Sequence, residues 1–353
     1  MTTLQHLLRI ALPIIQAPMA GVQGPALAVA VSNAGALGSL PGAMLSPEAL
    51  RTELGALTAQ TAQPFNVNFF CHAPPLPDAA RAAAWRAALA PYHAEFGIDV
   101  STLATGPERM PFTHEVADVL ATFRPPVLSF HFGLPGPDLV QRVKAWGAVV
   151  LSSATTLAEA LWLEAHGADA VIAQGLEAGG HRGMFLSDDL ARDIDTQVGV
   201  FALLPQLVQA LRIPVIAAGG IADARGVAAA MALGAAGVQV GTAYLLCPEA
   251  TTSAVHRAAL QSDAAQTTAL TNLFTGRPAR GIVNRLMRDL GPMSAAVPAF
   301  PLASTLIAPL RAQAEALGRG DFSPLWSGQN ASGCRAVPAA QLTRELAAGL
   351  LAH

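Results

Sequence analysis

The stretch "PVIAAGGIADARGVAAAMALGAAGVQVGTAYL", residues 214–245, decides the fold of this chain. It begins with a short apolar run at 214–220 that ends in two glycines, and a second such run follows at 237–245. Between them, residues 223–234 are rich in Ala and end at a glycine, which suits the C-terminus of a helix. A buried strand, a helix and a second buried strand are the repeating unit of a parallel α/β sheet.

The same alternation runs through most of the chain. Further apolar runs, most of them ending in Gly, Pro or Ser, lie at 13–19, 35–41, 65–70, 127–132, 148–154 and 170–175. Helical patterns lie at 24–35, 46–58, 138–147, 156–167 and 203–212, and the second of these starts with Ser46 as a helix cap before Pro47. Strands and helices in this alternation predict a (β/α)₈ TIM barrel. A doubly wound open sheet is the competing α/β fold, but it usually has fewer units.

Two regions break the alternation. Residues 71–126 are too long for one crossover between strands and predict one or two extra helices, and residues 247–353 predict a helical tail. We therefore expect a barrel domain made of residues 1–70 and 127–246. The helical insertion at 71–126 and the C-terminal accessory region at 247–353 should pack together at one mouth of the barrel as a small lid.

Composition limits the classes of function. The chain is 52% hydrophobic and 13% charged with a formal net charge of −3, so it has a large core and no basic surface for nucleic acid. It has no Lys/Arg run for a membrane surface, and its apolar stretches are interrupted by polar residues, Gly and Pro. Three distant cysteines, Cys71, Cys247 and Cys334, indicate neither a disulfide framework nor a metal site. We expect a cytoplasmic protein.

Chemistry in a barrel takes place at the C-terminal ends of the strands. Polar side chains are rare in this sequence, and they gather at these ends, among them Asn66, Ser152 and the candidate cofactor contacts Asn68 and Gln174. Ala17 and Met19, at the end of the first strand, are candidate cofactor contacts as well. The amides of Asn68, Gln174 and Gln239 together favour a flat heteroaromatic ring with N–H and C=O edges.

Two glycine-containing stretches follow the last two predicted strands and indicate a phosphate site. They comprise Ala218, Gly219 and Gly220 after the seventh strand and Gln239, Val240, Gly241 and Thr242 at the eighth. Backbone N–H groups of small residues can approach an anion closely, and the seventh and eighth loops form the usual phosphate site of a barrel. The phosphate could belong to a flavin mononucleotide (FMN) or to a sugar phosphate substrate.

The stretch "EAGGHRG", residues 177–183, places His181 just after the sixth strand, next to Gly179 and Gly180. Such backbone can pass close to a ligand and leave the imidazole pointing into a cleft. Arg182 is interpreted as a surface or salt-bridging residue, with attraction of an anion as the alternative. Glu177 either supports the site or forms a hydrogen bond at a helix start or in a loop. His131, in "SFHFG", is a structural or a functional residue. The other histidines carry no site signal; they are His6, His72, His93, His114, His166, His256 and His353.

Taken in order, "PIIQAPMAGVQGPALAVAVSNAGALGSL", "FNVNFF", "SFHFGLP", "DAVIAQGLEAGGHRGMF", "PVIAAGGIAD" and "GVQVGTAYL" resemble the nitronate monooxygenases, formerly called 2-nitropropane dioxygenases. The resemblance covers residues 13–246, with a further echo in "TNLFTGRPARG", and "SFHFG" with "EAGGHRG" is similar to the class I members. One departure is "NVNFFCHAPP", where Cys71 and His72 stand in a stretch that we would expect to be apolar.

The resemblance implies an FMN-dependent enzyme that oxidises alkyl nitronates, among them propionate 3-nitronate, with O₂ to a carbonyl compound and nitrite. It makes His181 the catalytic histidine and His131 a second active-site histidine. The positions that match the family's FMN contacts are Asn68, Gln174, Gly179, Gly219 and Gln239 to Thr242. Rival functions on the same scaffold are a flavin-dependent enoyl-acyl-carrier-protein reductase and an NADH:quinone reductase. A flavin- or phosphate-binding module without turnover is a third alternative.

Overall fold

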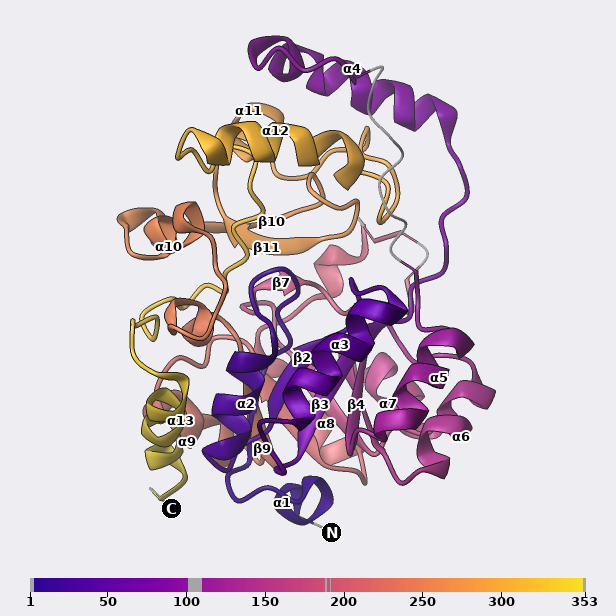
Figure 1. Cartoon of the computed structure of the whole chain (residues 1–353), viewed down its shortest axis with the longest axis vertical. Coiled ribbons are helices and arrows are strands. Elements are labelled where there is room, and N and C mark those ends of the chain that lie inside the picture. The colour runs from indigo at the N-terminus through magenta and orange to yellow at the C-terminus, as the bar shows by residue number, and fades with distance from the viewer. Residues whose placement is uncertain (1–2, 101–109, 188, 191, 352–353) are drawn as a thin grey trace.

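The computed structural model describes residues 3–100, 110–187, 189–190 and 192–351, and its centre is one eight-stranded parallel sheet (Figure 1). The strands run in the order β1-β9-β8-β6-β5-β4-β3-β2. At the two ends of this order, Ile15 of β1 pairs in parallel with Leu37, and the Gln16 N–H donates to the Leu37 carbonyl at 2.9 Å. The sheet therefore closes into a barrel, which confirms the predicted (β/α)₈ fold over the open sheet. The strands are β1 (Ile14–Gln16), β2 (Gly38–Pro41), β3 (Phe65–Phe70), β4 (Val127–His131), β5 (Val149–Ala154), β6 (Ala170–Gln174), β8 (Val215–Ala218) and β9 (Gly237–Val240).

Strand β3, "FNVNFF", shows why buried strands carry few but specific polar residues. All six of its residues are buried. Val67 and Phe69 pack outward with helix residues such as Leu54 in one apolar cluster. Asn66, on the alternate face, donates from its amide nitrogen to the Ser129 hydroxyl at 2.8 Å. The period of two thus separates an outer apolar layer from an inner polar one.

The helices between the strands form the outer ring. They are α2 (Pro25–Asn33), α3 (Pro47–Thr58), α5 (His114–Phe123), α6 (Pro137–Ala145), α7 (Leu157–Ala165), α8 (Val200–Ala210) and α9 (Ala224–Ala232). Ser46 caps α3 as predicted, because its hydroxyl accepts the Ala49 N–H at 3.2 Å. Helix α1 (Leu4–Leu8) covers the other end of the barrel, where Leu4 and Leu8 are buried with Ile15.

A second layer lies over one end of the barrel (Figure 1). It has its own apolar core, in which Trp85 and Leu89 of α4 pack with Leu310 of α12 and with Phe322. The tail was expected to be helical, but it also contains two strands in an antiparallel sheet of order β10-β11-β7, in which β11 pairs with both β10 and β7. The elements are α4 (Ala79–Glu95), β7 (Gly180–His181), α10 (Ala254–Leu260), β10 (Thr268–Thr271), β11 (Ala279–Ile282), α11 (Arg285–Leu290) and α12 (Ser304–Ala316).

Two helices of the predicted insertion and tail lie on the barrel wall instead. Helix α5 packs between α3 and α6, so it is the crossover helix from β3 to β4. Helix α13 (Ala339–Ala347) packs against α2 and α9. Residues 101–109 of the predicted insertion, and His353, lie outside the described residues. Within the described chain, no helix is both long enough and apolar enough to cross a membrane.

Candidate active site

A cavity of about 340 Å³ opens at the C-terminal ends of the barrel strands, between the barrel and the second layer. This volume is in the usual range for a small-molecule site. Every candidate residue from the sequence lines it, so the fold gathers side chains and backbone from six strand ends. They are Ala17, Met19, Asn68, His131, Gln174, Gly179, Gly180, His181, Ala218, Gly219, Gly220, Gln239, Val240, Gly241 and Thr242.

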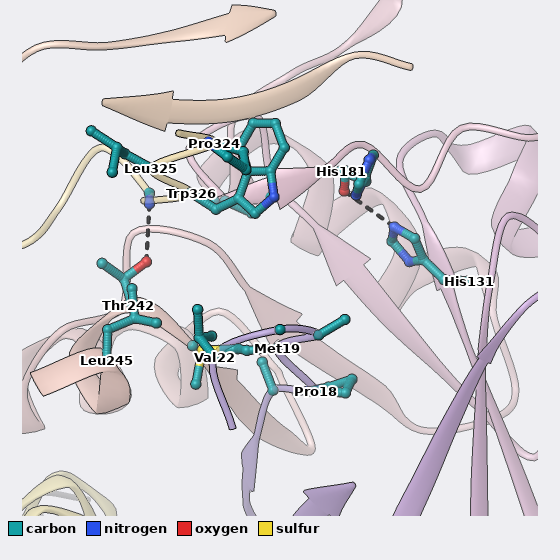
Figure 2. A pocket seen from close by; sticks show the side chains of 18 of the residues that line it. Pro18, Met19, Val22, His131, His181, Thr242, Leu245, Pro324, Leu325 and Trp326 are labelled. Atoms are coloured by element: carbon teal, nitrogen blue, oxygen red, sulfur yellow. Dashed lines mark hydrogen bonds between the residues drawn. The ribbon is translucent and has the colours of Figure 1, made fainter. Parts of the chain in front are cut away.

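The second layer supplies the opposite wall. Figure 2 shows Pro324, Leu325 and Trp326 on one side of the cavity and Met19 and Val22 on the other. Phe274 and Thr275 line the same cavity. The residues that the second layer contributes to this wall were not predicted from the sequence, because they follow no strand of the βα repeat. The only signal was the motif "TNLFTGRPARG", which contains Phe274 and Thr275.

His181 is held by backbone pairing rather than by an open loop. Gly180 and His181 form β7, in which His181 pairs with Ala279 of β11. The His181 carbonyl accepts two side-chain hydrogen bonds, from His131 Nε2 at 3.1 Å and from Gln174 Nε2 at 2.9 Å. The barrel and the second layer thus fix the position of His181 together (Figure 2).

The two glycines before His181 are required for different structural reasons. A Cβ on Gly179 would lie 2.5 Å from the Gly328 nitrogen, so this glycine allows the C-terminal segment to cross the stretch closely. Gly180 has a φ of +72° and nothing within 4 Å of its would-be Cβ, so its requirement is conformational. The two glycines therefore serve close packing and the direction of the chain within the protein.

His131 is a neutral donor aimed at the backbone of His181. Its Nε2 lies against a carbonyl oxygen and must carry the proton, so its Nδ1 accepts from the Ser153 hydroxyl at 3.1 Å. The pKa of His131 is lowered from 6.5 to about 4, mainly by burial; the hydrogen bond to the His181 carbonyl raises it, and the charges of Arg277 and Arg182 add to the lowering. At neutral pH this histidine organises the site and carries no charge.

The imidazole of His181 is surrounded by aromatic rings and one hydroxyl. Its Nε2 lies 2.9 Å from Thr275 Oγ1. The ring centres of Phe300 and Trp326 each lie 5.5 Å from its own. Phe70 lies edge-on at 6.1 Å. The imidazole therefore faces the cavity from a mostly apolar box.

Arg182 is buried, at 1% exposure, so its interpretation as a surface residue is wrong. Its guanidinium donates to the carbonyls of Gln174 and Gly175, at the end of β6, and to Gln197 Oε1. Burial lowers the pKa of this guanidinium to about 10, so it is charged at neutral pH. Glu177 accepts from the Val200 N–H at the start of α8, which is the helix-start hydrogen bond of the two alternatives.

The far side of the cavity offers unsatisfied polar groups. Gln239 Oε1 is buried and has no hydrogen-bond partner among the described residues. Gly219 and Gly220 have φ values of +115° and +71°, a conformation that suits glycine after β8. Gly241, the residue before the 3₁₀ helix Thr242–Leu246, and Thr242, its first residue, line the cavity.

Two histidines without a sequence signal belong to the surroundings of the site. His256 lines the cavity, and its Nε2 donates to the Trp326 carbonyl at 3.1 Å, although its place in the sequence carried no site signal. Burial lowers the pKa of His256 to about 4. His72 is buried, with its ring centre 4.8 Å from that of Phe300. The departure from an apolar stretch at Cys71 and His72 thus falls beside the aromatic box.

A closed parallel barrel with a histidine-bearing pocket at the C-terminal ends of its strands defines a TIM-barrel enzyme. The family model for nitronate monooxygenase matches residues 1–349, and the chain belongs to this family of oxidoreductases. A nitronate monooxygenase from Pseudomonas aeruginosa is 44% identical over 349 residues, which cover 97% of each chain.

Two solved structures show the same fold. The nitroalkane oxidase from Streptomyces ansochromogenes superimposes with a TM-score of 0.90 at 39% identity, covering 99% of this chain and 98% of that one. FabK from Thermotoga maritima has a TM-score of 0.72 at 28% identity, covering 99% and 96%. The resemblance seen in the sequence motifs is therefore confirmed over the whole chain.

Proposed function

We propose that this chain uses FMN to oxidise alkyl nitronates with O₂, releasing a carbonyl compound and nitrite. Membership of the nitronate monooxygenase family supports the reaction class. The observation that carries the assignment of the site is the position of His181. Its imidazole lines the cavity that also contains the glycines after β8 and β9.

The residues of the cavity fit a flavin. Gln239 Oε1, buried and unpartnered, would accept from an N–H of the ring, and Asn68 and Gln174 present further amides. Gly219, Gly220, Gly241 and Thr242 would hold the phosphate through backbone N–H groups. A bound flavin would supply the redox chemistry between the nitronate and O₂.

The roles proposed for the protein residues follow from charge. A nitronate carries its negative charge on the nitro oxygens, so an N–H of His181 would hold that charge. His181 would also be the general base if the neutral nitroalkane were used. His131 would keep the His181 backbone in place through its Nε2–H, and the rings of Phe300 and Trp326 pack beside the His181 imidazole.

The organisation of the chain is proposed on the same basis. The barrel of residues 1–70 and 127–246, with α5 counted in, would bind the cofactor. The second layer, made of α4 and of most of the chain beyond residue 246, would close the cavity. The three cysteines are unpaired, which supports an enzyme of the reducing cytoplasm.

Anaerobic mixing of the purified flavoprotein with ethylnitronate, and separately with NADH, tests the function. We expect ethylnitronate to change the flavin spectrum and NADH to leave it unchanged. Reduction by NADH alone would favour one of the reductases, and a protein without flavin affinity would contradict the proposal.

The role of His181 is tested by His181→Asn, with His166→Asn on the outer face of the barrel as a matched control. His181→Asn should keep FMN and lose at least about 100-fold in kcat/KM for the nitronate, whereas the control should be unchanged. Unchanged kcat/KM in His181→Asn would reject the role of this residue.

A further inference from the structure

We propose that Thr275 is a positioning residue that keeps the His181 imidazole in place in both of its protonation states. The inference rests on the function proposed for His181 and adds to it a residue outside the barrel. Thr275 lies between β10 and β11, is 4% exposed, and comes within hydrogen-bond distance of His181 through its hydroxyl.

The backbone of His181 and its ring are held by different parts of the molecule. His131 and Gln174 donate to the His181 carbonyl, and β11 pairs with β7. These contacts fix the main chain and leave rotation of the side chain open. On the ring itself, Phe300 and Trp326 provide shape, and Thr275 Oγ1 provides a directed polar contact to Nε2 at 2.9 Å.

A hydroxyl suits this position because it can be donor or acceptor. When Nε2 carries a proton, Thr275 Oγ1 accepts a hydrogen bond from it. The hydroxyl hydrogen of Thr275 can then turn to the Arg277 carbonyl, which lies 3.5 Å away. When Nε2 is deprotonated, the same hydrogen turns to Nε2. The imidazole can therefore take up or release a proton without losing its partner or changing its place.

The turn that presents this hydroxyl is fixed by packing. Gly276 has a φ of +92°, and a Cβ there would lie 2.3 Å from the Pro298 carbonyl oxygen. Its N–H donates to the Asn272 carbonyl at 2.8 Å. Thr275 and the Arg277 carbonyl thus flank a glycine that no other residue can replace without moving the chain.

The test compares Thr275→Val, which keeps the shape and removes the hydroxyl, with Thr275→Ser, which keeps the hydroxyl. Thr271→Val is the matched control, since Thr271 is equally buried and its hydroxyl accepts the Leu273 N–H. The flavin-loaded proteins are labelled with ¹⁵N-histidine, and the ring signals of His181 are assigned by their absence in His181→Asn. The titration midpoint of this ring is then measured, together with kcat/KM for ethylnitronate.

In Thr275→Val both protonation states lose their partner at Nε2. Since a hydrogen bond to a charged group is stronger than one to a neutral group, the protonated ring loses more, and the midpoint should move to lower pH by about one unit. The value of kcat/KM should fall about 10- to 100-fold. Thr275→Ser should titrate and react nearly as the wild type, and Thr271→Val should not differ from it. If Thr275→Val loses its flavin, Thr275→Ala gives the same comparison.

An unchanged His181 midpoint in both Thr275→Val and Thr275→Ala would overturn the inference. The titration is read in the resting protein, so its result is independent of turnover. If the midpoint moves as expected but neither the wild type nor any variant oxidises a nitronate, the role of Thr275 in positioning His181 is supported and the proposed function is rejected.

Discussion

His131 should make the folded protein sensitive to mild acid. Its folded pKa is about 4, against an ordinary value of 6.5, because burial disfavours the imidazolium. As the pH falls below 6.5, the unfolded chain takes up a proton that the folded chain does not. The stability that His131 contributes is therefore complete above pH 6.5 and is lost as the pH falls toward 4.

Between pH 7.5 and pH 5 this linkage is worth about 2 kcal/mol, since each pKa unit corresponds to about 1.4 kcal/mol and the folded state is still neutral at pH 5. The change to make is His131→Gln, in which the amide N–H₂ can still donate to the His181 carbonyl. Equilibrium urea unfolding at both pH values, with FMN in fixed excess, gives the loss of stability for wild type and variant.

We expect the acid-induced loss to be smaller by about 2 kcal/mol in His131→Gln. His256, whose pKa is also lowered to about 4 by burial, offers an independent repeat of the measurement, and the double variant His131→Gln, His256→Gln should show both reductions. If wild type and His131→Gln lose equal stability between the two pH values, the neutral, buried state assigned to His131 is wrong.

Three further changes probe the pocket. Gly179→Ala should release bound FMN, because its Cβ would lie 2.5 Å from the Gly328 backbone nitrogen; free flavin fluorescence measures the release. Gly180→Ala should cost only about 1 kcal/mol of backbone strain and keep the flavin. Gln239→Leu should weaken FMN binding by about tenfold in a flavin titration. The thermal stability of the apoprotein should not fall, since Gln239 Oε1 has no partner among the described residues. Arg182→Met should lower the free energy of unfolding in urea by about 3 kcal/mol, because three buried acceptors lose their donor; a loss below about 1 kcal/mol would show that these acceptors are not isolated from water.

The barrel and the gathering of its strand-end residues could be predicted from the sequence because both depend on local periodicity. Each buried strand has its own apolar run, and parallel strands bring their C-terminal ends to one face whatever the loops do. Asn68, His131 and Gly219 therefore meet in one cavity although they are far apart in the chain. The cap of Ser46 on α3 is local in the same sense.

The roles within that cavity depend on contacts between distant segments, which carry no periodic signal. Arg182 resembles a surface residue in the sequence, and only the carbonyls at the end of β6 show that it is buried. Thr275 and Trp326 come from the second layer, whose strands β10 and β11 were expected as helix.

The sequence by itself determined the barrel, the cavity at its C-terminal end and His181 as a residue of that cavity, because strand period and chain direction are local properties. Only the tertiary structure decided how His181 is held. Its carbonyl is bound by two barrel side chains, its backbone by β11 and its ring by Thr275, and these partners stand 7 to 98 residues away in the chain. Hydrogen bonds over such separations arise from packing, which no short stretch of sequence encodes.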